Sequence, residues 1–223
     1  MEAVLKLGGS LAEDPVALKD LCAELGRLAK DHRILIVPGG GRFADLVREM
    51  HQRFLLSDPV SHKMAILAMD QMGYILTDLI QNAQEIYVTS EAEELSRKRM
   101  LPVLLPSRLL LGEAPLEASW DVTSDSIAAY VAILSHAEKL ILITDVDGIY
   151  KIDPKEYTDA ELLRSISAVE LLNLKRRTSV DRYLPKILLK KQLECYVVNG
   201  RHPERVRAIL RGEKTLCTEI TIS

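Results

Sequence analysis

Two kinds of hydrophobic pattern alternate along the chain. Short runs of aliphatic and β-branched residues predict buried strands, and longer segments in which apolar residues recur every three or four positions predict helices. The short runs lie at residues 3–7, 34–37, 85–89, 103–105, 140–144 and 195–198. The helical segments lie at residues 14–31, 43–52, 57–79, 124–136, 168–174, 181–192 and 203–210. Asp14 and Pro15 supply an N-cap and a first-turn proline to the first of these helices.

This alternation predicts an α/β fold. Continuous apolar strands separated by helices are typical of a mostly parallel open sheet that helices cover on both faces, a three-layer αβα sandwich. No low-complexity linker and no internal repeat interrupts the pattern, so we expect a single domain with two lobes over residues 1–223. Ligands of such sheets bind at the carboxyl ends of the strands, so the strand-to-helix junctions are where functional residues are expected.

The composition narrows the class of protein. The chain has 223 residues, a mean hydropathy of +0.04 and no apolar run of 18 residues, so we expect no membrane span. Met1 leads directly into an apolar strand, and we expect no secretory signal. Cys22, Cys195 and Cys217 are odd in number and far apart, which fits neither a disulfide framework nor a zinc site. A cytoplasmic protein is the simplest expectation.

Charge is unevenly distributed. Residues 175–223 carry 12 Lys and Arg against 5 Asp and Glu, whereas residues 1–174 carry 17 against 27. The basic part suggests a phosphorylated small molecule or a nucleic acid as a partner, although a solvated basic face is the simpler explanation. Aromatic residues make up 4% of the chain and none interleaves with the basic run at 175–177. This argues against a base-stacking nucleic-acid surface.

Two glycine-rich loops directly follow the first two predicted strands. The first loop is formed by Lys6, Leu7, Gly8, Gly9 and Ser10, and the second by Gly39, Gly40, Gly41 and Arg42. Glycines let the backbone approach an anion closely, and a neighbouring cation adds charge. Each loop could equally be a tight turn. Neither contains GxxxxGK[ST] or GxGxxG, so we expect neither a P-loop nor a Rossmann dinucleotide site.

A third junction follows the predicted strand at 140–144. Its polar residues and glycine are Thr144, Asp145, Asp147, Gly148 and Tyr150. The Asp-x-Asp-Gly spacing resembles the start of an EF-hand loop, but the later calcium ligands and the closing Glu are missing. Acidic side chains and a tyrosine on such a loop could instead hold a base and a ribose.

Together the three junctions resemble those of the amino-acid kinase superfamily, which includes acetylglutamate, carbamate, UMP and isopentenyl phosphate kinases. Two further segments match in the same order. Residues 123–129 resemble the family's aspartate-bearing helix start, with Asp125 as the aspartate, and residues 185–187 resemble its second catalytic lysine, Lys186. The resemblance covers almost the whole chain and implies the fold of that family.

The resemblance also implies an ATP-dependent kinase with a defined set of site residues. Lys6 would contact the transferred phosphoryl group, Lys186 would contact the leaving nucleotide phosphates, and Asp125 would orient both lysines. The residues implied in ATP binding are Gly8, Gly9, Ser10, Thr144, Asp145, Asp147, Gly148 and Tyr150. The residues implied in acceptor binding are Gly39, Gly40, Gly41, Arg42 and His62. Mg²⁺ would be bound mainly through ATP, without a dedicated protein metal site.

Alternatives stay open at several of these residues. Lys186 could belong to a solvated basic helix, and His62 could cap or pack its helix rather than touch the acceptor. Arg42 beside the triple glycine favours a phosphate or carboxylate, unless it faces solvent. Arg48 is interpreted as a plain exposed charge. The family's Gly-Gly-Met ahead of the second lysine is absent, and residues 178–185 stand in its place.

The segments at residues 56–78 and 120–132 are similar to the branch of the family that phosphorylates an aminomethyl-furanmethyl phosphate in methanofuran biosynthesis. That branch makes a diphosphate from a phosphate monoester, and this is the expected function. The alternatives are an isopentenyl phosphate or UMP kinase, or a non-catalytic protein that binds a nucleotide or oxyanion. The resemblance implies an acceptor lobe at about 1–135 and a nucleotide lobe at about 136–223. We expect a small phosphorylated substrate, no membrane or nucleic-acid partner, and a homo-oligomer.

Overall fold

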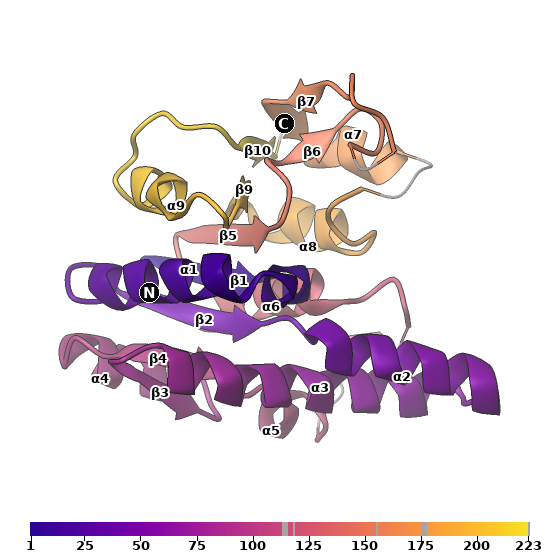
Figure 1. Cartoon of the computed structure of the whole chain (residues 1–223), viewed down its shortest axis with the longest axis horizontal. Helices are drawn as coiled ribbons and strands as arrows, with labels where there is room; N and C mark the ends of the chain where they lie inside the picture. The colour runs from indigo at the N-terminus through magenta and orange to yellow at the C-terminus, as the bar shows by residue number, and fades with distance from the viewer. Residues whose placement is uncertain (113–115, 118, 155, 175–177, 223) are drawn as a thin grey trace.

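The chain folds around an eight-stranded sheet, shown in Figure 1. The computed structural model describes residues 1–112, 116–117, 119–154, 156–174 and 178–222, so the basic run at 175–177 lies outside the described residues. Neighbouring strands are parallel except β9 and β10. In spatial order the strands are β3 (Ala83–Ile86), β4 (Leu101–Leu104), β2 (Ile34–Pro38), β1 (Ala3–Leu7), β5 (Lys139–Thr144), β9 (Glu194–Asn199), β10 (Thr218–Thr221) and β8 (Ser165–Ser167).

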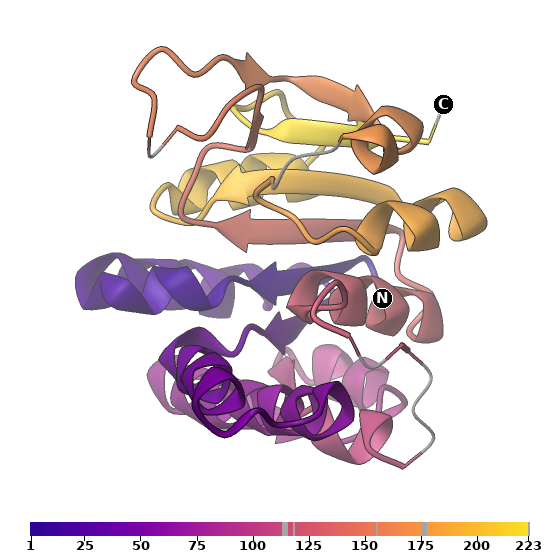
Figure 2. The same ribbon diagram turned by 90° about the vertical axis from the view of Figure 1, so that its right-hand side faces the viewer.

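Helices cover both faces of this sheet, as Figure 2 shows, and the predicted three-layer α/β fold is confirmed. One face carries α1 (Pro15–Leu28) and α9 (Pro203–Leu210), and the other carries α6 (Ser124–Leu134), α7 (Ala168–Asn173) and α8 (Leu184–Lys191). The remaining elements are the 3₁₀-helix η1 (Gly9–Glu13), the adjacent helices α2 (Gly41–Phe54) and α3 (Asp58–Leu79), the short helices α4 (Glu91–Arg97) and α5 (Ser107–Leu110), and the hairpin strands β6 (Ile149–Tyr150) and β7 (Leu162–Leu163).

The alternation of side chains along β1 determines the face of the sheet on which Lys6 lies. Ala3, Leu5 and Leu7 belong to the core beneath α1 and α9, whereas Val4 belongs to the core beneath α6. Successive strand residues point to opposite faces. Lys6 therefore lies on the α6 face, next to the start of that helix. A lysine is exceptional here, because central strands of a parallel sheet are almost entirely apolar. Its neighbours on β1, Leu5 and Leu7, are both buried.

Several element boundaries differ from the predictions. The helix predicted at 14–31 ends at Leu28, the helix predicted at 181–192 begins at Leu184, and the strand predicted at 85–89 lies at Ala83–Ile86. The late start of α8 has a local cause, since the Asp181 carboxylate accepts hydrogen bonds from the backbone N–H groups of Tyr183 and Leu184 as a cap would. The elements η1, α4, α5 and β6–β8 were not predicted, because they are too short to show a period.

No helix of the described residues is both long enough and apolar enough to span a lipid bilayer.

Candidate active site

The two glycine loops meet at the carboxyl ends of β1 and β2. A Cβ added to Gly9 would lie 2.2 Å from the Gly41 nitrogen, and one added to Gly39 would lie 2.8 Å from the Gly9 nitrogen. Side chains at these positions would hold the two backbones apart. Gly41 also has a φ of +52°, in the left-handed region that favours glycine. These glycines therefore allow the two loops to pack backbone against backbone.

Lys6 and Asp125 form an ion pair beside these loops. Lys6 Nζ lies 2.7 Å from Asp125 Oδ1, and the side chains are 12% and 7% exposed. Burial raises the pKa of Asp125 and the Lys6 ammonium opposes that rise. The other carboxylate oxygen, Oδ2, accepts a hydrogen bond of 3.1 Å from the backbone N–H of Asp181. The structure thus brings together two of the three residues predicted to be catalytic.

A cavity next to Lys6, which we call the Tyr150 cavity, contains most of the residues predicted to bind ATP. Its volume is about 320 Å³, within the range of small-molecule sites. The predicted residues that line it are Gly8, Gly9, Ser10, Thr144, Asp145, Gly148 and Tyr150. The Ser10 hydroxyl donates a hydrogen bond of 3.0 Å to Asp145, which ties the first glycine loop to the loop after β5.

Asp147 does not line the Tyr150 cavity among the described residues. Its carboxylate instead accepts hydrogen bonds from Arg205 on α9 and from Asn199 at the end of β9, the latter at 3.0 Å. Partial burial acts to raise the pKa of Asp147, but these hydrogen bonds outweigh it and hold the pKa below its ordinary value. Asp147 therefore fixes the loop that carries the cavity residues.

A second cavity, the His62 cavity, lies between α2, α3 and the start of α6. The residues lining it include Gly40, Ala44, Arg48, Asp58, His62, Ile66, Trp120, Thr123 and Ser124. His62 is half-buried, and its burial lowers the pKa of the imidazole, so the ring is neutral at pH 7. The structure thus places Gly40 and His62 together, as expected of an acceptor site.

The two arginines near the triple glycine differ in their position relative to this cavity. Arg42 is exposed and makes a two-pronged ion pair with Glu13, with contacts of 2.7 Å and 2.6 Å. Among the described residues lining the His62 cavity, Arg48 is present and Arg42 is not. Arg48 is itself exposed, pairs with Asp45 at 2.6 Å and lies 5.6 Å from the centroid of the Trp120 ring. A different partner, Glu13 of η1, draws Arg42 away from the cavity.

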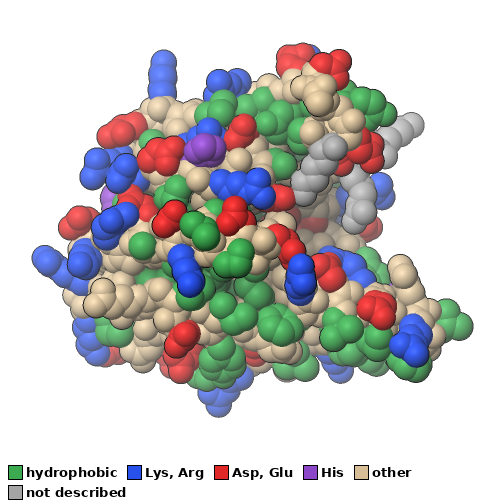
Figure 3. Space-filling view, viewed as in Figure 1, with side chains coloured by type: hydrophobic (Ala, Val, Ile, Leu, Met, Phe, Trp, Pro, Cys, Tyr) green, Lys and Arg blue, Asp and Glu red, His purple; other side chains and the backbone are tan. Residues whose placement is uncertain are grey.

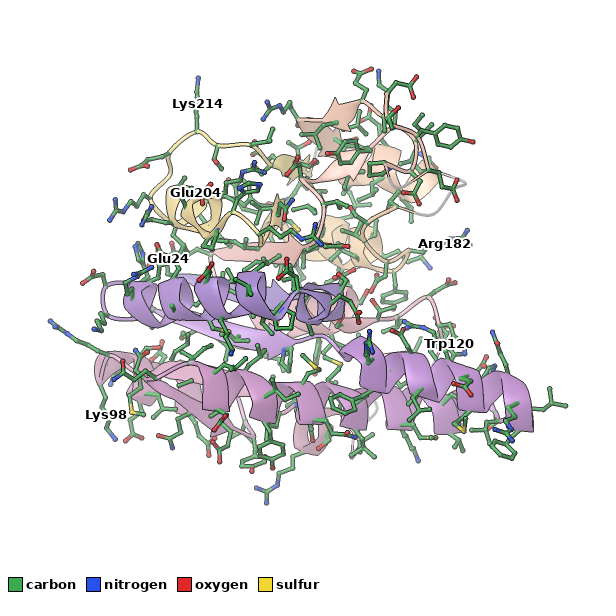
Figure 4. The ribbon with its side chains drawn as sticks, in the orientation of Figure 1. Glu24, Lys98, Trp120, Arg182, Glu204 and Lys214 are labelled. Carbon is green, nitrogen blue, oxygen red and sulfur yellow. The ribbon has the colours of Figure 1, made fainter. Side chains whose placement is uncertain are left out.

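A third cavity, the Arg182 cavity, joins the other two. It shares Trp120 and Thr123 with the His62 cavity and Thr178 and Ser179 with the Tyr150 cavity, and Asp125 also lines it. Figure 3 shows the molecule hollowed on this side, above α2. In Figure 4, Trp120 and Arg182 lie at the same end of the sheet, the end toward which β1 and β2 run.

Lys186 lies apart from Lys6 and Asp125. It is exposed on α8, and its ammonium lies 5.0 Å from the centroid of the Tyr183 ring. It lines a fourth cavity, in which neither Lys6 nor Asp125 takes part. The structure therefore does not bring the second predicted lysine to the first.

Sequence reasoning missed Asp181. Its carboxylate accepts six hydrogen bonds: from the backbone N–H groups of Thr123, Ser126, Tyr183 and Leu184, and from the hydroxyls of Thr123 and Ser126. It thereby caps the starts of α6 and α8 together. An aspartate four residues before Pro185 is a signal for the cap of α8. No sequence signal shows that the same carboxylate also holds α6.

Comparisons with known proteins find relatives over almost the whole chain. The model of the "Amino acid kinase family" matches residues 1–199. The [5-(aminomethyl)furan-3-yl]methyl phosphate kinase of Methanocaldococcus jannaschii is 38% identical over 221 residues, which cover 97% of this chain and 96% of that protein. The uridylate kinase of Pyrococcus abyssi is 26% identical, with 96% of each chain covered.

Two solved structures have the same fold. Uridylate kinase from Archaeoglobus fulgidus superposes with a TM-score of 0.77 at 25% identity, covering 99% of this chain and all of the other. UMP kinase from Bacillus anthracis gives a TM-score of 0.80 at 17% identity, covering 99% of this chain and 96% of the other.

Proposed function

The chain belongs to the amino acid kinase family and is a phosphotransferase, and we propose that it transfers the γ-phosphoryl group of ATP to a phosphate monoester. The observation that carries the proposal is the contact of Lys6 with Asp125. Lys6 lines the Tyr150 cavity and Asp125 lines the adjoining Arg182 cavity, so the ion pair stands between them. A phosphoryl group passing between a donor and an acceptor would meet the Lys6 ammonium there.

The chemistry suits such a site. An oxygen of the acceptor phosphate forms a bond to the γ-phosphorus, the bond from that phosphorus to its bridging oxygen breaks, and ADP leaves with the electron pair. A phosphate monoester has a second pKa of about 6, so its nucleophilic oxygen is ionised at neutral pH without a general base. Stabilisation of the negative charge is the main requirement that remains. Lys6 supplies the positive charge for this stabilisation, and Asp125 holds Lys6 in place.

On the donor side, we propose that the loop of Gly8, Gly9 and Ser10 holds the ATP phosphates and that the β5–β6 loop lies along the nucleoside. The volume of the Tyr150 cavity between these loops, about 320 Å³, supports this assignment. Mg²⁺ would enter bound to the ATP phosphates, and the carboxylate of Asp145 in the cavity wall suits such a complex. The role of Lys186 as a ligand of the leaving phosphates stays a prediction.

On the acceptor side, the side chains that line the His62 cavity support an aminomethyl-furan phosphate, although this cavity of about 60 Å³ would have to widen toward the adjoining Arg182 cavity to admit it. The wall of the His62 cavity offers an indole ring, Trp120, for stacking and a carboxylate, Asp58, for a cation, and the guanidinium of Arg48 would exchange its ion pair with Asp45 for the anion of the ligand. An aminomethyl group is an ammonium at neutral pH, so the compound named for the M. jannaschii relative carries all three complementary parts. Apart from Lys6 and the loop at 8–10, residues before about 135 would thus hold the acceptor, and residues after it the nucleotide.

UMP is the second candidate acceptor, because relatives of this chain include uridylate kinases. UMP has a phosphate and a flat ring but no ammonium to face Asp58. An acceptor panel with ATP and Mg²⁺, read by ADP formation, separates the candidates. We expect turnover with the aminomethyl-furan phosphate to exceed that with UMP and isopentenyl phosphate at least tenfold. A preference for either of the latter would reassign the acceptor.

We further propose that the protein self-associates through α2 and α3. Their exposed apolar side chains include Leu46, Val60, Leu67, Tyr74 and Ile75, and Figure 3 shows hydrophobic side chains over these helices. Patches of this kind on otherwise polar proteins commonly mark contact surfaces. Light scattering should give a mass of at least twice 25.0 kDa. A monomer would contradict this part of the proposal.

A further inference from the structure

The Arg182 cavity is the place where a donor and an acceptor would meet. It shares two wall residues with the Tyr150 cavity and two with the His62 cavity, and Asp125 lies in its wall. A group transferred between ligands in the two outer cavities would therefore lie in or beside it. Three negatively charged side chains, Asp121, Asp125 and Asp181, line this same cavity. A phosphoryl group there requires more positive charge than Lys6 alone provides.

Among the described residues that line this cavity, Arg182 is the cationic one. Its side chain is exposed, and it has no hydrogen-bond or ion-pair partner within the described part of the chain. Lys6, by contrast, is paired with Asp125 at 2.7 Å. Lys186 lines the fourth cavity, which shares Asp121, Asp181 and Arg182 with this one, and its ammonium lies 5.0 Å from the Tyr183 ring centroid. Arg182 is therefore the cation that lines the junction itself with its hydrogen-bonding capacity unused.

The backbone on both sides of Arg182 is held against the catalytic aspartate. The N–H of Asp181 donates to Asp125 Oδ2 at 3.1 Å, and the N–H groups of Tyr183 and Leu184 donate to Asp181 Oδ1 at 3.1 Å and 2.8 Å. The other oxygen of the Asp181 carboxylate accepts from Thr123 and Ser126 at the start of α6. The Cα of Arg182 is thus fixed relative to Asp125, while its side chain is able to move toward a ligand.

We propose that Arg182 is a catalytic residue that contacts the phosphoryl group in transfer, and that Asp181 is the residue that positions it. This inference rests on the proposed phosphoryl transfer. The bond to the acceptor oxygen forms and the bond to the ADP oxygen breaks as described above. Arg182 donates two hydrogen bonds to the equatorial oxygens during that change. A guanidinium suits this role because its fork of donors matches the geometry of a phosphoryl group.

Arg182→Gln and Lys191→Gln form a matched pair for a kinetic test, since each removes one exposed cation from the same stretch of chain. We expect Arg182→Gln to lower kcat about 100-fold with little change in the KM for ATP. Arg182→Lys should recover part of the loss, and Lys191→Gln should stay within threefold of the wild type. A loss of the same size in both variants would show a general effect of charge and would overturn the inference. A folded Arg182→Gln protein with a kcat within threefold of the wild type overturns the inference.

A second measurement does not depend on the acceptor. Calorimetry gives the affinity for Mg²⁺-ADP with and without aluminium fluoride, a mimic of the phosphoryl group in transfer. Aluminium fluoride should tighten binding to the wild type at least tenfold and have little effect in Arg182→Gln, while the affinity for Mg²⁺-ADP alone stays unchanged. An enhancement that survives in the variant, or that the wild type lacks, overturns the inference. A wild type that shows the enhancement but phosphorylates no phosphate acceptor contradicts the proposed function alone.

Discussion

Lys6 Nζ and Asp125 Oδ1 lie 2.7 Å apart, in a contact that joins the central strand β1 to the first turn of α6. The residues are separated by 119 positions in the sequence, and they lie on two elements that pack against each other, β1 and α6. The contact depends on two local features: the alternation that turns Lys6 toward α6, and the start of α6 at Ser124. Its place between the Tyr150 and Arg182 cavities makes it the centre of the proposed site.

Substitution of Lys6 should abolish turnover without unfolding the protein. In Lys6→Gln, the amide still donates a hydrogen bond to Asp125 but carries no charge to stabilise the phosphoryl group. We expect kcat to fall at least 100-fold, with a much smaller change in the KM for ATP. Lys30→Gln, at an exposed position after α1, is the control and should match the wild type. A kcat within threefold of the wild type in folded Lys6→Gln would remove Lys6 from the mechanism.

Asp125→Asn separates catalysis from helix capping. The side chain of Thr123, and not that of Asp125, accepts the capping hydrogen bond at the start of α6. The amide of Asn should therefore leave α6 intact, while an uncharged group no longer holds the Lys6 ammonium. We expect kcat to fall about 100-fold and the melting temperature to change little, measured by circular dichroism. Asp20→Asn on α1 is the control. A fully active but less stable Asp125→Asn would instead assign Asp125 a purely structural role.

Arg48 and Arg42 lie on the same helix, but their substitution should change the KM for the acceptor to very different extents. Arg48 lines the His62 cavity, so Arg48→Gln should raise the KM for the acceptor about tenfold, as expected for the loss of a hydrogen bond to a charged group. Arg42→Gln should leave that KM within twofold, since Arg42 pairs with Glu13 at the surface. The KM for ATP should be unchanged in both. A larger effect at Arg42 than at Arg48 would contradict the placement of the acceptor.

His62 should make the stability of the protein depend on pH. Burial holds the pKa of folded His62 below its ordinary value of 6.5. Between the lowered pKa and 6.5 the unfolded chain binds a proton at this residue and the folded chain does not, so stability falls as the pH falls through this window. Urea unfolding should show that the free energy of unfolding falls less between pH 7 and pH 5 in His62→Gln than in the wild type. Equal losses in the two proteins would show that His62 is not buried in solution.

Much of the fold and part of the site follow from local sequence. The apolar run at residues 3–7 predicts β1, and Asp14 acts as the predicted N-cap of α1 by accepting a hydrogen bond from Ala17. The glycine loops were predicted because each follows an apolar strand. These features depend on residues a few positions apart, which periodicity and capping rules describe.

The missed features depend on partners distant in the sequence. Arg42 is turned to the surface by Glu13, which lies 29 positions earlier on an unpredicted 3₁₀-helix. Asp181 reaches Ser126 across 55 positions, and only the packing of α8 beside α6 makes that contact possible. Spacing along the chain contains no information on such contacts.

The central claim is that the acceptor is a phosphate and the product a diphosphate. ³¹P NMR of the wild-type protein with ATP, Mg²⁺ and either the aminomethyl-furan phosphate or the free furan alcohol tests it directly. We predict a pair of coupled diphosphate resonances that grow together with those of ADP from the phosphate, and a rate at least 100-fold lower with the alcohol, since Arg48 would then lack its anion. Formation of a monoester from the alcohol at a comparable rate would contradict the claim.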